Sequence, residues 1–88
     1  MSTTKLINGD AMDYIADRIT IDDTLLNGKP AIRGKRIAVA TILEFLSAGD
    51  TKEEILKAYP FLEIEDINAC LKFAAEIMNR DYTFKGAA

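Results

Sequence analysis

The sequence predicts a mainly α fold, a three-helix helix-turn-helix domain preceded by a short β/turn segment. From residue 39 onward, apolar residues recur with the 3.6-residue period of α-helices, interrupted by a glycine and a proline. Before residue 39, the chain instead alternates apolar and polar residues and contains turn signals. A length of 88 residues with 49% hydrophobic composition is typical of one small globular domain.

The N-terminal segment, residues 1–17, gives a mixed signal and is expected to be partly ordered. Met12, Ile15 and Ile19 are spaced as on one face of a helix that Asp10 would cap. A turn followed by an extended segment fits these residues nearly as well, and the segment either folds alone or packs across a dimer. The main domain is assigned to residues 18–80, and a C-terminal tail to residues 81–88.

A short strand and a double turn are expected next. Residues 19–22 alternate apolar and polar positions and are rich in β-branched side chains, which predicts a strand. An Asn-Gly pair, a proline and a further glycine then favour two chain reversals and disfavour a central strand. Ile32 and Ile37 are expected to anchor this double turn in the core. The residues that shape the turn are Asn27, Gly28, Pro30 and Gly34.

The first two helices have clear ends in the sequence. Apolar residues at helical spacing begin at Val39, and Gly49 provides the stop signal. Thr51 and Glu54 then have the spacing of a capping box, in which each side chain accepts a hydrogen bond from the backbone of the other residue. Pro60 ends this second helix within about two turns.

A third helix is expected from about residues 63–65 to Asn79. Its apolar arc is broad enough to be covered on two sides, by the other helices and by a second subunit or the N-terminal segment. Cys70 lies on the apolar face and is interpreted as a small core residue. Glu63, Glu65 and Asp66 are interpreted as surface acids that compensate the helix dipole.

Charge is distributed unevenly along the chain. The segment Lys29–Arg36 holds four of the 11 Lys and Arg residues and no acid, so the other residues carry seven cations against 14 Asp and Glu, a net charge of −7. A cationic segment on an acidic body predicts a specific anionic partner, and a pI of about 4.8 argues against general nucleic-acid coating. The candidate partner-binding residues are Lys29, Arg33, Lys35 and Arg36.

Enzymatic activity is not expected from this composition. The chain has no histidine, and its cationic segment contains no nucleophile, general base or metal ligand, so no catalytic residue, metal or cofactor is assigned. With a single cysteine, no internal disulfide can form. No stretch of 18 apolar residues or export signal is seen, which predicts a cytoplasmic protein without a membrane partner. Small domains gain from oligomerisation, and a homodimer is expected.

Residues from about 18 to 80 closely resemble the bacterial and archaeal family known as domain of unknown function 433. The resemblance is carried by residues 27–37, with the pattern Gly-Lys-Pro-x-Ile-Arg-Gly-x-Arg-Ile, and by residues 48–56 and 59–60. It implies a homeodomain-like helical fold and a role as an antitoxin partner of PIN-like ribonuclease toxins. Two departures are Glu63, where the family often has Thr or Ser, and Lys35, where it commonly has a small polar residue. The first argues against DNA reading by the third helix, and the second strengthens the cationic segment.

Two functional hypotheses follow from the cationic segment. PIN-type nucleases hold metal with clustered carboxylates, and Arg33 and Arg36 on a rigid loop would pair with them while the two lysines steer the approach. Alternatively, Arg33 or Arg36 pairs internally with Asp22, Asp23 or a helix C-terminus and only pins the loop. The second functional class is a helix-turn-helix regulator that binds operator DNA, including that of its own operon.

Overall fold

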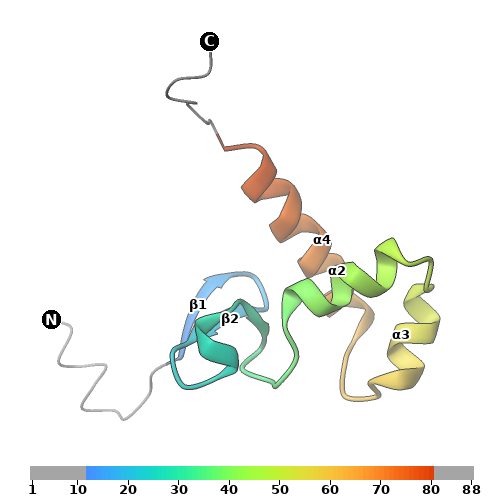
Figure 1. Ribbon diagram of the computed structural model, residues 1–88, viewed down its shortest axis with the longest axis horizontal. Helices are drawn as coiled ribbons and strands as arrows, with labels where there is room; N and C mark the ends of the chain where they lie inside the picture. Colours follow the sequence, from blue (N-terminus) through green and yellow to red (C-terminus); the bar gives the residue numbers. More distant parts are fainter. Residues whose placement is uncertain (1–11, 81–88) are drawn as a thin grey trace, which may run out of the picture.

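The fold is α+β, with a small antiparallel sheet followed by three α-helices (Figure 1). The structure, a computed structural model, describes residues 12–80. Residues 1–11 and 81–88 lie outside the described residues, and with them the predicted cap at Asp10 and the predicted C-terminal tail. The elements in chain order are β1 (Met12–Ala16), β2 (Ile19–Asp22), a 3-10 helix η1 (Leu26–Gly28), β3 (Ala31–Ile32), α2 (Val39–Ser47), α3 (Lys52–Ala58) and α4 (Ile64–Met78).

The predicted mainly α class is wrong, because the chain before residue 39 forms a three-stranded sheet. The helix considered near Met12 is strand β1. A two-residue turn at Asp17 and Arg18 folds β1 back onto β2, where its backbone groups join an antiparallel ladder. Pairing with a neighbouring strand thus overrides the helical spacing of the apolar residues.

The central strand of the sheet is β2, in the order β1-β2-β3. Its predicted bounds, Ile19–Asp22, are confirmed. β3 pairs antiparallel with it through Ile32 and Ala31. Because β3 is a two-residue edge strand, Pro30 directly before it removes no donor from a central ladder.

The three predicted helices are confirmed close to their predicted ends. α2 begins at Val39 and ends at Ser47, and Gly49 beyond it has a φ of +101°, which suits a helix C-terminus. At the start of α3, the Thr51 hydroxyl accepts from the Glu54 backbone N–H and the Glu54 carboxylate accepts from the Thr51 N–H. α4 ends one residue before its predicted end.

The hydrophobic core lies where the sheet meets the helices. Ile19 of β2, Ile32 of β3, Ile42 of α2 and Ile67 of α4 have no exposed surface. Cys70 of α4 is also buried, as predicted. Burial of side chains of this size is worth roughly 1.5–3 kcal/mol each. The core therefore fixes the sheet, and the turns it carries, against α4.

Candidate functional site

The predicted basic segment, Lys29–Arg36, is built into a short hairpin. Ala31 forms an antiparallel bridge with Ala38, and the Ile32 N–H donates to the Ile37 carbonyl at 3.2 Å. Ile32 and Ile37 are buried, which confirms them as the apolar anchors. Both arms of this basic hairpin are therefore attached to the core.

The tip of the basic hairpin is a tight turn. The Lys35 N–H donates to the Ile32 carbonyl at 2.7 Å, and the two central residues, Arg33 and Gly34, have φ of +46° and +69°. Positive φ at both positions is type I′ geometry, which glycine adopts freely and arginine at a cost of roughly 1–2 kcal/mol. The Gly34 N–H also donates to the buried Thr20 hydroxyl at 2.8 Å. The tip is thus held by hydrogen bonds on two sides.

The four predicted partner-binding cations do not gather into one patch. Lys29 lies at the base of the basic hairpin, whereas Lys35 and Arg36 lie at its tip. None of these three side chains has a hydrogen bond or ion pair within residues 12–80, and Arg36 is exposed. Arg33 instead turns back into the fold. The hairpin therefore presents two cations at its tip and one at its base.

At the start of α4, Asp66 binds the guanidinium groups of two arginines. Arg33 binds it bidentately, with Nε donating to Oδ1 at 2.9 Å and Nη2 to Oδ2 at 2.7 Å. Arg18 Nη1 donates to Asp66 Oδ1 at 2.8 Å and to Glu63 Oε1 at 2.6 Å. The Glu63 backbone N–H donates to Asp66 Oδ2 at 2.8 Å. We name this cluster of Arg18, Arg33, Glu63 and Asp66 the Asp66 clasp.

The Asp66 clasp is charged at neutral pH. The Asp66 side chain has no exposed surface, and those of Arg18 and Arg33 are 27% and 26% exposed. Burial alone raises the pKa of Asp66, but hydrogen bonds from Arg33, the Glu63 backbone and Arg18 together outweigh it and lower the pKa to about 2. Hydrogen bonds to Glu63 and Asp66 raise the pKa of Arg18, and that to Asp66 raises the pKa of Arg33.

The clasp also ties two turns to each other. Arg18 lies in the turn between β1 and β2 with a φ of +64°, so both arginines of the clasp have a left-handed backbone. The Arg33 N–H donates to the Arg18 carbonyl at 2.9 Å. Two strained turns are therefore joined through their backbones and through one carboxylate. The clasp sets where the tip of the basic hairpin lies relative to α4.

The low pKa of Asp66 predicts a loss of stability in acid. Because its pKa is lowered on folding, the stabilisation is complete above the unfolded-state pKa near 3.9 and is lost as pH falls toward 2. We expect the clasp to account for about 2 kcal/mol of the loss in unfolding free energy between pH 5 and pH 2. An NMR titration of the Asp66 carboxyl carbon should give a midpoint near 2. A midpoint at or above 3.9 would contradict the assignment.

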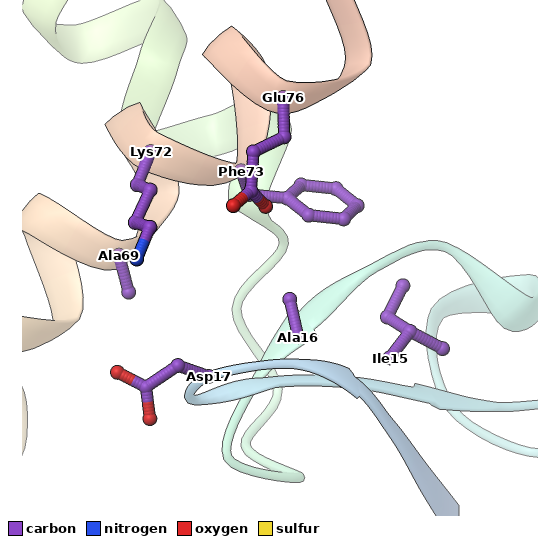
Figure 2. A pocket seen from close by; sticks show the side chains of 7 residues that line it. All are labelled: Ile15, Ala16, Asp17, Ala69, Lys72, Phe73 and Glu76. Atoms are coloured by element: carbon purple, nitrogen blue, oxygen red, sulfur yellow. The ribbon is translucent and has the colours of Figure 1, made fainter. Parts of the chain in front are cut away.

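A small pocket of about 180 Å³ lies between β1 and α4 (Figure 2). Figure 2 shows Ile15 and Ala16 on the sheet side and Phe73 on the helix side, with Lys72 and Glu76 along α4. Asp17, Lys72 and Glu76 are the charged residues of its lining.

A larger apolar groove lies between the start of α2 and the C-terminal half of α4. Its volume is about 440 Å³, and Val39, Leu43, Ile77 and Met78 contribute to its walls. Lys29, at the base of the basic hairpin, lies at its edge. This apolar groove places one of the exposed cations beside an apolar surface.

The described residues give little basis for metal or thiol chemistry. Within residues 12–80, no three His, Cys, Asp or Glu side chains are grouped so as to hold a metal ion. Burial raises the pKa of Cys70 to about 12, so its thiol stays protonated and is a poor nucleophile. None of the helices in this part of the chain has the length and hydropathy needed to cross a membrane.

Comparison with known proteins agrees with the resemblance seen in the sequence. A family model described as a protein of unknown function (DUF433) matches residues 19–74, more than half of the chain. The chain belongs to the DUF433 family. The crystal structure of a DUF433 member from Anabaena variabilis ATCC 29413 is similar to it, with a TM-score of 0.65 and 24% identity over 85% of this chain and 69% of the other. This likeness supports the α+β fold, and no curated protein gives a significant match.

Asp66 is the residue of this DUF433 protein that sequence reasoning misinterpreted. It was expected as a surface acid, but it is buried, whereas Glu63 and Glu65 are exposed. Internal pairing of Arg33 was considered with Asp22, Asp23 or a helix C-terminus, yet its partner lies at a helix N-terminus. One signal was available: an acid three residues after the helix cap has capping-box spacing.

Proposed function

We propose that this DUF433 protein is a non-enzymatic, antitoxin-like binding module that neutralises a PIN-like ribonuclease in the cytoplasm through the tip of its basic hairpin. The observation that carries the proposal is the presentation of Lys35 and Arg36 on a turn that the core and the Asp66 clasp hold in place. A guanidinium pairs bidentately with the carboxylates that such a nuclease uses to hold metal. Because the turn is already ordered, little conformational entropy is lost on binding.

The cations of the basic hairpin have different roles in this proposal. Arg36 is exposed and enters the carboxylate cluster of the nuclease, while Lys35 adds to the local positive charge. Arg33, predicted earlier to bind the partner itself, acts as a positioning residue because its guanidinium is engaged by Asp66. Its own contact with a partner stays a prediction.

The apolar groove supplies a second contact for the same partner. Protein interfaces combine an apolar centre with a polar or charged rim. The apolar groove, with Lys29 at its edge, has this composition. We infer that an apolar segment of the nuclease lies in the groove while its acidic site meets the tip.

The test is co-expression with a PIN-like nuclease encoded beside this protein, followed by pull-down and an RNA-cleavage assay. Wild type should bind the nuclease and suppress cleavage. The Lys35→Ala/Arg36→Ala variant should bind at least about tenfold more weakly, because charge pairs that are desolvated at an interface are costly to break. A matched control, Lys57→Ala/Arg80→Ala, removes one exposed lysine and one exposed arginine elsewhere and should behave like wild type.

Two results would contradict the proposal. If wild type neither binds nor inhibits the nuclease, the proposed antitoxin-like function is wrong. If the Lys35→Ala/Arg36→Ala variant inhibits the nuclease as well as wild type does, the tip of the basic hairpin is not the binding site.

Binding of operator DNA is the second candidate, because α3 and α4 are joined by a short turn as in helix-turn-helix proteins. The start of α4 disfavours it, because Glu65 is exposed there and would repel phosphate, whereas the Glu63 carboxylate is already paired with Arg18. Titration of a duplex from upstream of the gene at several salt concentrations separates the candidates. Affinity that falls steeply with salt supports DNA binding, and no association opposes it.

A further inference from the structure

The helix α4 has two apolar faces, and the fold uses one of them. Ile67 and Cys70 are fully buried against the rest of the domain. On another face, Ile64, Leu71 and Met78 are 37%, 40% and 73% exposed. These three residues are seven apart, so they lie along one side of the helix.

Residues between these three complete a heptad pattern. Asn68 and Ala75 are exposed and give, with the other three, a spacing of four, three, four and three residues. This is the spacing of the a and d positions along a coiled-coil seam. Figure 1 shows the C-terminal end of α4 extending beyond the sheet and away from α3. We name these five residues the α4 stripe: Ile64, Asn68, Leu71, Ala75 and Met78.

We propose that the α4 stripe is the contact surface between two copies of this chain, with their α4 helices antiparallel. Glu65 and Lys72 are exposed and flank the stripe along one edge. A twofold axis between Asn68 and Leu71 brings Glu65 of each copy beside Lys72 of the other, which gives two ion pairs. This inference does not rest on the proposed function, although Met78 belongs to both the α4 stripe and the apolar groove.

The opposite edge of the stripe argues against parallel helices. In a parallel pair, flanking charges meet across the seam between the two different edges. The second edge of this stripe carries Ile67 and Ala74, which have no charge. A parallel arrangement would therefore gain no ion pair.

The polar position of the stripe is compatible with the antiparallel arrangement. The Asn68 side-chain oxygen already accepts a hydrogen bond from Lys52 Nζ of α3 at 2.8 Å. It therefore does not require the asparagine pair that favours parallel dimers. The same axis places Ile64 opposite Ala75 of the second copy, a large residue against a small one, which allows close packing.

The contact is small, so the dimer should dissociate reversibly. α4 has 15 residues and is about 22 Å long. A helix pair of this length buries less than the roughly 1,200–2,000 Å² of a stable standard interface. We therefore expect the mass of the protein in solution to depend on its concentration.

Sedimentation equilibrium of the full chain, from roughly 1 to 500 μM, tests the proposal over the range in which small interfaces associate. The mass should rise from monomer toward dimer. Leu71→Glu should weaken the dimer at least about 100-fold, because it places a charge in the apolar seam. Leu71 does not line the apolar groove, so the variant leaves that surface intact.

Charge reversal tests the antiparallel register. Lys72→Glu should weaken the dimer about tenfold, and Glu65→Lys/Lys72→Glu should restore it, because the swapped charges again meet as opposites. Lys57→Glu on α3 makes the same charge change as Lys72→Glu at an exposed position off the stripe and should have no effect. Circular dichroism confirms that each variant is folded.

Three outcomes would overturn the proposal. One is a full chain that stays monomeric at every concentration. If removal of residues 81–88 then allows dimerisation, that segment, and not a second copy, covers the stripe. Another is a dimer that Leu71→Glu does not weaken. The third is a charge swap that fails to restore association, which would exclude the antiparallel register.

Discussion

Replacing Asp66 by alanine is expected to lower the free energy of unfolding by about 4 kcal/mol. Asp66 has no exposed side-chain surface and accepts hydrogen bonds from Arg18, Arg33 and the Glu63 backbone. Its removal leaves two guanidinium groups and a backbone N–H without their acceptor. A domain of this size has a total stability on the order of 4–13 kcal/mol, so the variant should lose from about a third to nearly all of it.

Urea unfolding followed by circular dichroism measures this loss. Glu65→Ala is the matched control, because it removes an exposed acid from the same helical turn, and it should change stability by less than about 0.5 kcal/mol. Asp66→Asn keeps the side-chain shape and one acceptor oxygen, so its loss of unfolding free energy should lie between those of Asp66→Ala and Glu65→Ala. An Asp66→Ala variant with the urea midpoint of wild type would show that the clasp contributes nothing to stability.

Elements with local signals were predictable from the sequence. The capping box of Thr51 and Glu54 marks the start of α3 without reference to the rest of the chain, and Gly49 marks the end of α2 in the same way. The alternation in β2 gave its bounds. In each of these cases the physical cause lies within a few residues.

The sheet depended on contacts between elements and was predicted only in part. β1 has exposed residues at most of its positions, so it shows neither the burial of a core strand nor a regular alternation. Its conformation follows from pairing with β2, whose residues lie three or more positions away in the chain. The fold class was wrong for this reason, although the helices were placed correctly.

In the candidate site, too, the features with local sequence signals were predictable and those that depend on contacts between elements were not. The buried anchors Ile32 and Ile37 and the turn at Gly34 could be read from the basic segment itself. The partner of Arg33 could not, because Asp66 is 33 residues away and only the packing of α4 against the hairpin brings them together. Charge counting alone treats all four cations as equivalent, whereas the fold distinguishes one of them.

Replacing Arg33 by alanine should therefore act on the fold more than Arg36→Ala does. Arg33 makes the bidentate contact with Asp66. Its loss should lower the unfolding free energy by about 2–3 kcal/mol, because the buried carboxylate then keeps only its hydrogen bonds from Arg18 and the Glu63 backbone. Arg36 is exposed and has no side-chain hydrogen bond or ion pair within residues 12–80, so Arg36→Ala should change stability by less than about 0.5 kcal/mol.

Arg33→Lys separates charge from geometry in the same measurement. Lysine keeps the positive charge but cannot reproduce the bidentate fork, so Arg33→Lys should recover only part of the lost stability. Equal urea midpoints for Arg33→Ala and Arg36→Ala would contradict this division of roles. If the midpoints differ as expected, loss of partner binding by Arg33→Ala reports a displaced tip, and Arg36→Ala is the variant that tests direct contact.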